Sequence, residues 1–481
     1  MLPKDKGVQD KFEFVSIENL VPQEHLLRKI ERAIDFSFIR EKCSHLYCDN
    51  NGRPAIDPVV LYKMIFIGYL YGIRSERQLV RDVEVNVAYR WFLGMGLTDK
   101  VIDHSTLSQN RRRRFNASDI AQDIFDEIVL MCIRQNLIKG ETLFSDSTHL
   151  KANANKHKFT REIVNQNTRQ YLDELEQSIN EDRASHGKKP LKESPKDEGP
   201  EQKEIKQSTT DPESGYMVRD GKPEGFFYLD HRTVDSEHNF ITDVYVSPGN
   251  VYDSICYMER LEYQTNKFGF EVKRVALDAG YNTADICHGL VEKNIFGAIG
   301  YRRPPGNGKG FYKKDYLYNA EKDVYLCPRG SELTYRTTDR NGYRHYASNA
   351  KVCVSCPNLL SCTTSKNCRK VITRHVWEGD KEKVKANRLS PEGKELYKRR
   401  KETIERSFAD AKELHGYRYA RFRGLQKVTT QCLLTAACQN MKKLALIFYR
   451  KKQKGLNEAL SSLFSWISEA FYPHFKLNSC Y

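Results

Sequence analysis

The stretch ETLFSDST, residues 141–148, decides the fold, because it reads as a buried strand with an acidic residue near its end. Two further strands are predicted over 224–235 (EGFFYLDHRTVD) and 240–250 (FITDVYVSPGN), where β-branched and aromatic residues stand between turn residues. This second pair is predicted to form a hairpin that turns at residues 236–239. Three such strands would begin a sheet.

Helices and strands alternate in the next part of the chain. We expect a helix from Asp253 to about Phe268, a strand that ends at Asp278, a helix over 282–294 and a strand over 295–301. This order of elements is typical of a mixed α/β sheet. Asp146 and Asp278 each stand at or near the end of a predicted strand, which is where sites are built in α/β sheets.

Residues 10–115 are predicted to be helical and compact. The apolar run that follows Pro58 indicates a buried helix, and a second helix is expected from the N-cap Ser75 through residue 95. A third, over 105–115 (STLSQNRRRRF), carries polar side chains that could contact bases and phosphates, among them Arg111, Arg112, Arg113 and Arg114. Three such helices resemble a helix-turn-helix unit, and a solvated basic helix is the alternative.

Length and charge narrow the class of protein. With 481 residues, the chain is long enough for two or more domains. Its net charge of +15 favours a polyanionic partner, most simply nucleic acid. We expect no membrane helix, because the longest apolar stretch is shorter than the roughly 20 residues that span a bilayer. The N-terminus does not resemble a secretory signal, so a cytoplasmic location is expected.

Two stretches look irregular. Residues 156–214 are polar, and we expect a helix near 161–180 and then a flexible connection. A second irregular stretch is predicted over 302–376, and long helical patterns follow from Ser390. One of these patterns carries Glu405 on a face shared with Phe408.

Three carboxylates, Asp146, Asp278 and Glu405, would form a metal site if the fold brought them together. They could hold two Mg²⁺ or Mn²⁺ ions about 3.5–4 Å apart, the arrangement that serves phosphodiester chemistry. Taken singly, each is more often an ordinary surface or paired acid.

Three segments, FSDSTHLKANANK, VALDAGYNTADI and IERSFADAKELHGYRYARFRGL, resemble in this order the catalytic blocks of bacterial insertion-sequence DDE transposases. The resemblance is to the branch with a helical N-terminal domain and a cysteine-bearing insertion, and it runs from about Phe12 to Tyr449. It implies a ribonuclease-H-like catalytic domain in which Asp146, Asp278 and Glu405 are the catalytic acids. The family's Tyr before the Glu and its Lys after it match Tyr397 and Lys412.

The family also has an Arg before the Glu, and here the spacing departs. Arg400 follows Tyr397 by the expected three residues, whereas Lys401 stands at the strict distance from Glu405. The domains expected from the sequence and the resemblance are a helical DNA-binding domain (1–135), the first part of the catalytic domain (136–301, with the polar stretch 156–214), a cysteine-rich insertion (302–376), the Glu helix and the rest of the catalytic domain (377–450), and a C-terminal tail (451–481).

The resemblance implies a function. The protein is expected to bind double-stranded DNA at terminal inverted repeats, to hydrolyse the transposon ends, and to join the freed 3′-OH to target DNA, acting as a homodimer in the bacterial nucleoid. Two alternatives stay open: a DNA-binding regulator without catalysis, and a metal-dependent nuclease without strand transfer.

Clustered cysteines suggest a second metal. Cys353, Cys356, Cys362 and Cys368 have C-x2-C-x5-C-x5-C spacing and Cys327 precedes them, so five thiols are candidates for one tetrahedral Zn²⁺ site. The resemblance favours Cys327, Cys353, Cys356 and Cys362, in a structural role. Reduced, partly buried thiols are the alternative.

Positive charge gathers on and after the Glu helix, interleaved with aromatic residues. Such side chains would contact DNA phosphates, and a solvated helix is the alternative. The candidates are Tyr397, Arg400, Lys401, Lys412, Arg418, Arg421 and Arg423.

Overall fold

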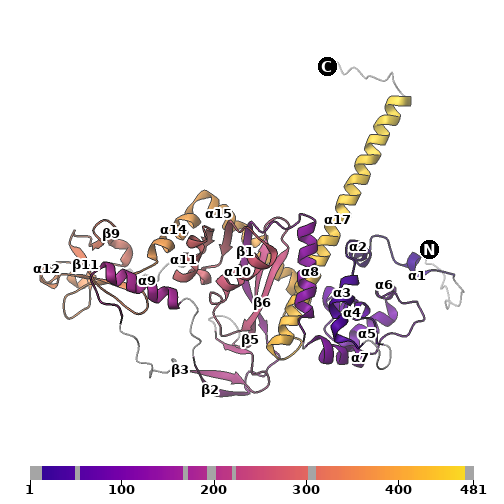
Figure 1. The fold of residues 1–481 in the computed structure, drawn as a ribbon, viewed down its shortest axis with the longest axis horizontal. Helices are drawn as coiled ribbons and strands as arrows, with labels where there is room; N and C mark the ends of the chain where they lie inside the picture. The colour runs from indigo at the N-terminus through magenta and orange to yellow at the C-terminus, as the bar shows by residue number, and fades with distance from the viewer. Residues whose placement is uncertain are drawn as a thin grey trace, which may run out of the picture. The chain divides into compact units, whose positions relative to one another are not determined.

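The computed structural model describes residues 14–48, 55–116, 118–165, 172–191, 202–218, 224–301 and 310–471 (Figure 1). Residues 192–201 of the polar stretch and residues 302–309 at the start of the predicted insertion lie outside these ranges. The chain divides into two compact units. A helical unit comprises the chain up to Ile138, Phe240–Val246 and the chain from Ser407; a sheet unit comprises Lys139–Asn239 and Ser247–Arg406. The five-part division expected from the sequence stays a prediction.

The larger sheet is mixed, as predicted. Strand β1 (Thr142–Lys151) pairs antiparallel with β5 (Gly225–Asp235) and parallel with β7 (Arg274–Leu277), and β7 pairs parallel with β8 (Phe296–Ile299). Strand β6 (Ile241–Pro248) pairs with β5. The strand order through this part is therefore β6-β5-β1-β7-β8. The chain turns between β5 and β6 at the predicted place, where Asn239 has a φ of +61°.

The polar stretch contains more structure than expected. Strands β2 (Phe159–Asn165) and β3 (Gln202–Ser208) pair antiparallel along their whole lengths, and β4 (Gly215–Met217) links β3 to β5. The helix predicted from 161 was therefore wrong over 161–165, because partner strands supply hydrogen bonds that local propensity does not anticipate. The helical part, α9, spans Leu172–Ser185.

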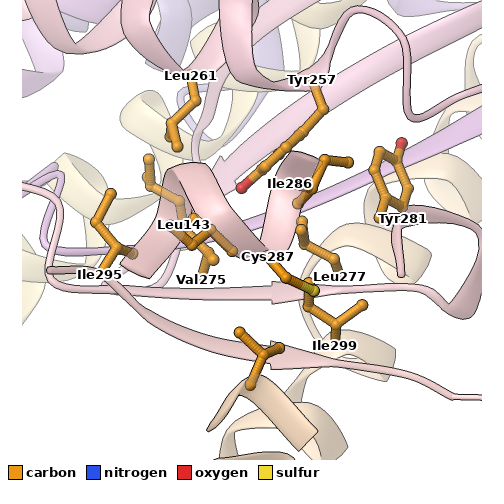
Figure 2. Close-up of a cluster of buried hydrophobic side chains, with 12 residues drawn as sticks. Leu143, Tyr257, Leu261, Val275, Leu277, Tyr281, Ile286, Cys287, Ile295 and Ile299 are labelled. Atoms are coloured by element: carbon orange, nitrogen blue, oxygen red, sulfur yellow. The ribbon is translucent and has the colours of Figure 1, made fainter. Parts of the chain in front are cut away.

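A hydrophobic core fixes the strands that carry the acidic residues (Figure 2). Leu143 of β1, Val275 and Leu277 of β7 and Ile299 of β8 pack against helices α10 (Tyr257–Phe268), α11 (Ala284–Glu292) and α14 (Glu378–Leu389). Burial of side chains of this size contributes about 1.5–3 kcal/mol each. The ends of β1 and β7 are thus held by a tightly packed layer.

The insertion forms its own sheet, so the irregular structure predicted for 302–376 was wrong. Strands β9 (Leu317–Asn319), β10 (Val324–Leu326), β11 (Glu332–Thr338), β12 (Tyr343–Ser348) and β13 (Val371–His375) form a five-stranded antiparallel sheet in the order β13-β12-β11-β10-β9. Its core is built largely from tyrosines, Tyr316, Tyr325 and Tyr346, with Leu333 and Ile372. Aromatic rings bury large areas, which is why few aliphatic residues suffice. Short helices α12 (Ala350–Val354) and α13 (Leu359–Cys362) lie between β12 and β13.

The helical unit begins much as expected. Helix α4 (Pro58–Leu70) has Pro58 in its first turn and is capped by Asp57, and α7 (His104–Asn110) is capped by Asp103. The second predicted helix is interrupted, because the Asn86 side chain accepts from the Tyr89 N–H and caps a new helix. It therefore forms α5 (Glu76–Val85) and α6 (Val87–Phe92).

Further helices complete the chain. They are α1 (Ile17–Leu20), α2 (Leu26–Ala33), α3 (Ser37–Cys43), α8 (Ile120–Arg134), α15 (Pro391–Lys398), α16 (Ile404–Leu414) and α17 (Leu425–Phe471). Helix α17 packs on α2, α4 and α8. Across the described residues, none of the helices combines the length and apolar character that crossing a membrane requires.

Candidate active site

The two predicted aspartates lie on neighbouring parallel strands. Ser145 of β1 is paired with Leu277 of β7, so Asp146 and Asp278, the next residues, are side by side at the same edge of the sheet. Across the other neighbour, Asp146 faces Arg232 of β5. Asp278 directly follows β7, as predicted, whereas Asp146 lies in the middle of β1, because β1 continues to Lys151 in its pairing with β5.

Arg400 joins the two aspartates. Its Nη2 donates to Asp146 Oδ2 at 2.6 Å, and its Nη1 lies 3.6 Å from Asp278 Oδ1. The Arg400 side chain is 4% exposed, against 21% for Asp146 and 53% for Asp278. Lys401, the residue at the strict family spacing, is exposed instead. The fold therefore selects Arg400 as the basic residue of this site.

The electrostatics of Asp146 reflect its burial. Desolvation raises the pKa of Asp146 to about 6, while Arg400 and the Ser147 N–H oppose that rise. The charges of Asp278 and Asp253 raise the pKa further. An added positive charge near Asp146 would therefore favour the ionised form of its carboxyl group.

Tyr397 supports Arg400 from the preceding helix, α15. The Arg400 Nη1 donates to the Tyr397 hydroxyl at 3.5 Å, and the Arg400 guanidinium lies 5.3 Å from the centre of the Tyr397 ring. Gly300 allows this packing, because a Cβ at that position would lie 2.6 Å from the Tyr397 hydroxyl and 2.9 Å from the Ala279 nitrogen. Tyr397 therefore lies at the turn that follows Asp278.

Glu405 belongs to the same compact unit as the two aspartates. It lies in the first turn of α16 and is exposed, while its neighbour Phe408 is buried. Among the described residues, no three His, Cys, Asp or Glu side chains are close enough together to hold a metal ion. The structure thus brings Asp146 and Asp278 together, but these two acids and Glu405 do not form a group of three that could hold a metal ion.

The donor set nevertheless fits Mg²⁺ or Mn²⁺. Mg²⁺ is usually bound by one or two carboxylates plus water and substrate phosphates, so a closed protein cage is not required. A further carboxylate, Asp253, has a buried Oδ1 with no hydrogen-bond partner among the described residues.

The cysteines of the insertion lie near its tyrosine core. Cys327 and Cys362 both pack against that core, and Cys362 Sγ lies 3.0 Å from the Tyr316 hydroxyl. Cys353 Sγ donates to the Ser348 hydroxyl at 3.2 Å. None of the five candidate cysteines, including Cys356 and Cys368, forms a disulfide. Two of the thiols therefore have polar partners of their own, and no set of three is arranged for a metal in the described chain.

The remaining basic candidates belong to the helical unit, where several are engaged. Arg111 binds Glu76 at 2.8 Å and lies over the Phe422 ring, and Arg421 lies over the Tyr69 ring. Arg114 lies over the Tyr47 ring. Arg418 pairs with Glu413, and both are exposed.

Other candidates are turned toward solvent. Arg112, Arg113 and Arg423 are exposed, and Lys412 is half-buried. Exposed residues such as Arg112 and Arg113 are the ones available to a partner.

Models of two protein families match parts of the chain. The transposase domain DUF772 matches residues 15–113, and the transposase DDE domain matches residues 326–445. The second match covers Glu405, Tyr397 and Arg400, and it also reaches the cysteine cluster. No curated protein matches.

Solved structures give weaker likenesses. The piggyBac transposase synaptic complex with hairpin DNA is 10% identical with a TM-score of 0.28, covering 91% of this chain and 84% of that one. The Mos1 mariner paired-end complex with Mn is 13% identical with a TM-score of 0.15, covering 56% of this chain and 65% of that one. Both TM-scores are low.

Proposed function

The two matched domains indicate an insertion-sequence DDE transposase, and we propose that Asp146, Asp278 and Glu405 are its catalytic acids. The observation that carries this proposal is the adjacency of Asp146 and Asp278 where the parallel pairing of β1 with β7 ends, bridged by Arg400. The reaction would excise an insertion sequence and integrate it elsewhere.

The fold of the sheet unit supports the proposal. We infer a ribonuclease-H-like fold, in which β1 pairs antiparallel with β5 and parallel with β7, and β7 pairs parallel with β8. The intervening helices α10 and α11 cover the sheet with the core shown in Figure 2. The start of the Glu helix, through Arg406, belongs to the same unit and follows an insertion that forms a separate sheet.

A DDE transposase uses divalent metal ions, and we propose two Mg²⁺ or Mn²⁺ ions here. When bound, such ions neutralise the scissile phosphate and activate the attacking oxygen. Asp146 and Asp278 would hold them from the sheet edge, and Glu405 from the start of α16. Arg400 would hold Asp146 in place and add positive charge toward the DNA phosphate.

Other residues of the chain would bind and orient the DNA. Arg400 and Tyr397 lie beside the acids and would orient the DNA backbone there, and Lys401 is exposed nearby in sequence. The basic side chains of the helical unit would bind the terminal inverted repeats through phosphates. Because two transposon ends must be joined to one target, we propose that a homodimer carries out the reaction, in the bacterial nucleoid.

Strand transfer distinguishes this function from its alternatives. The purified protein is incubated with Mg²⁺, DNA ends flanking its own gene and a supercoiled target plasmid. Joined products support a transposase. Cleavage without joined products would instead favour a nuclease, and binding without cleavage would favour a regulator.

We also propose a structural Zn²⁺ in the insertion, held by Cys327, Cys353, Cys356 and Cys362. Two of these thiols, Cys327 and Cys362, lie at the same tyrosine core. Cys368 is the matched control, because the resemblance makes it the extra cysteine. Metal analysis should give one zinc per chain, lost in Cys356→Ser and kept in Cys368→Ser. Folded wild-type protein without zinc would contradict this.

A further inference from the structure

The helical unit contains a pocket that is lined by none of the three proposed catalytic acids. It lies among α4, α5, α7, the segment that precedes α17 and the start of α17. Part of its wall is made of buried apolar and aromatic side chains, among them Tyr69, Leu79, Leu107 and Phe115. All the residues that line it belong to the helical unit. The pocket is therefore a feature of that unit by itself.

The charged side chains that line the pocket are mostly basic. They are Arg74, Arg111, Arg421 and Lys427, against a single acid, Glu76. Glu76 accepts a hydrogen bond from Arg111 Nε at 2.8 Å, so its charge is already offset. The lining therefore carries a net positive charge, which favours an anionic ligand.

Two of these arginines lie over aromatic rings that also line the pocket. The Arg421 guanidinium is 4.3 Å from the centre of the Tyr69 ring, and that of Arg111 is 4.0 Å from the centre of the Phe422 ring. Burial raises the pKa of Tyr69, and the charges of Arg421 and Arg111 both oppose that rise. Positive charge and flat aromatic faces thus occur together in this pocket.

Arg421 has hydrogen-bonding capacity that the protein does not use. Its Nη2 donates to the Gly68 carbonyl at 3.4 Å, which is long for such a bond. Its Nε is buried and has no acceptor among the described residues. A planar guanidinium can bind a phosphate through two parallel N–H bonds. A phosphate beside Arg421 would therefore give its charge a partner.

We propose that this pocket binds a nucleotide, with the base against the aromatic wall and the phosphate on Arg421. Every base has a flat face that stacks on aromatic side chains, and its phosphate supplies the negative charge. Two sources share this chemistry: a free mononucleotide, and a nucleotide turned out of bound DNA. The inference goes beyond the proposed function, because the three proposed catalytic acids belong to the sheet unit.

The first test is titration calorimetry of full-length protein with the four deoxynucleoside monophosphates, their nucleosides and inorganic phosphate. We expect one site per chain that binds a nucleotide more tightly than either of its halves. Arg421→Gln should weaken nucleotide binding about 10-fold. Arg418→Gln is the matched control and should leave the Kd unchanged, because Arg418 is exposed, pairs with Glu413 and does not line the pocket.

Phe422→Leu provides a second variant, because it removes an aromatic ring and keeps an apolar side chain. It should weaken nucleotide binding about fivefold or more. Circular dichroism checks that each variant is folded. Two results would overturn the proposal: nucleotide binding that neither Arg421→Gln nor Phe422→Leu weakens, and inorganic phosphate that binds as tightly as the nucleotides.

Photocrosslinking distinguishes the two sources. The probes are free 5-iodo-deoxyuridine monophosphate and the DNA ends flanking the protein's own gene, with 5-iodouracil in place of thymine at one position at a time. Crosslinks from the free probe to Tyr69 or Phe422 support a free mononucleotide, and crosslinks to them from DNA alone support a turned-out nucleotide. If no free nucleotide binds and neither residue is crosslinked by DNA, the proposal is wrong.

Discussion

Arg400 donates to Asp146 at 2.6 Å, although 254 positions of sequence separate the two residues. The contact joins the short 3-10 turn before the Glu helix to the strand that carries Asp146, the first of the proposed catalytic acids. Because Arg400 also lies 3.6 Å from Asp278, its charge stands where a divalent ion would neutralise the same pair. A metal ion bound to the two aspartates would therefore compete with Arg400 for the same negative charge.

Removing the charge of Arg400 should strengthen metal binding. At pH 8, where Asp146 with its pKa of about 6 is ionised, we expect Arg400→Gln to lower the Kd for Mn²⁺ about 10-fold, which corresponds to about 1.4 kcal/mol. Lys401→Gln, a change at the exposed neighbour, should leave the Kd within about twofold. Titration calorimetry measures both. Weaker Mn²⁺ binding in Arg400→Gln would show that the guanidinium supports the ion rather than competing with it.

A buried ion pair stabilises the strand beside β1. Arg232 Nε lies 2.7 Å from Asp230 Oδ2, and neither side chain is exposed. Removing one partner leaves the other charge buried without it. Arg232→Met should therefore lower the free energy of unfolding by about 3–5 kcal/mol. The double variant Asp230→Leu/Arg232→Met should lose less.

The exposed pair between Arg161 and Glu204 provides the control for that experiment. Arg161→Met should cost less than about 1 kcal/mol, because solvent screens this pair. Urea unfolding at pH 7.5 gives all three values. Equal losses in Arg232→Met and Arg161→Met would refute the role given to burial.

His231 should make stability depend on pH. Burial lowers the pKa of His231 to about 4, and the ring binds the Ser247 hydroxyl at 2.8 Å. In the unfolded chain a histidine titrates near 6.5, so the unfolded state takes up a proton first as the pH falls. The stabilisation is complete above about pH 6.5 and is lost towards pH 4, by about 3 kcal/mol in all.

Urea unfolding between pH 7.5 and 4.5 tests this dependence. His231→Gln should flatten the loss of stability over that range, whereas His157→Gln, at an exposed site, should follow the wild type. A wild-type curve that is level between pH 6.5 and 4.5 would be inconsistent with a neutral buried His231.

The arginines of the helical unit should separate into binding and structural residues. Arg112 and Arg113 are exposed, so Arg112→Gln/Arg113→Gln should weaken binding to the terminal DNA and reduce the salt slope by about 2. Its melting temperature should stay unchanged. Arg111→Gln should lower the melting temperature, because Arg111 binds Glu76 and lies over Phe422. Fluorescence anisotropy at several salt concentrations measures the slope, and an unchanged slope in the double variant would contradict the assignment.

Part of this structure could be predicted from sequence because the signals were local. Short apolar runs located β1 and β7, and the parallel pairing of these strands places Asp146 beside Asp278. Asp57 and Pro58 likewise marked the start of α4. The DDE resemblance supplied the order of the blocks, and the matched domain over 326–445 agrees with it.

Other features depend on partners far along the chain. Residues 161–165 form a strand because β3 pairs with them, and the insertion folds because tyrosines such as Tyr325 and Tyr346 meet across its strands. The choice of Arg400 over Lys401 follows from which side chain points to the sheet, and spacing alone did not decide it.

The central claim is that the three acids perform metal-dependent cleavage. The most direct measurement compares Mg²⁺-dependent cleavage of the DNA ends flanking its own gene by wild type, Asp146→Asn, Asp278→Asn, Glu405→Gln and the control Glu402→Gln, an exposed acid three residues before Glu405. We predict that cleavage falls at least about 100-fold in the first three variants, with DNA binding retained, and stays at the wild-type level in Glu402→Gln. Full cleavage by any of the three acid variants would contradict the account.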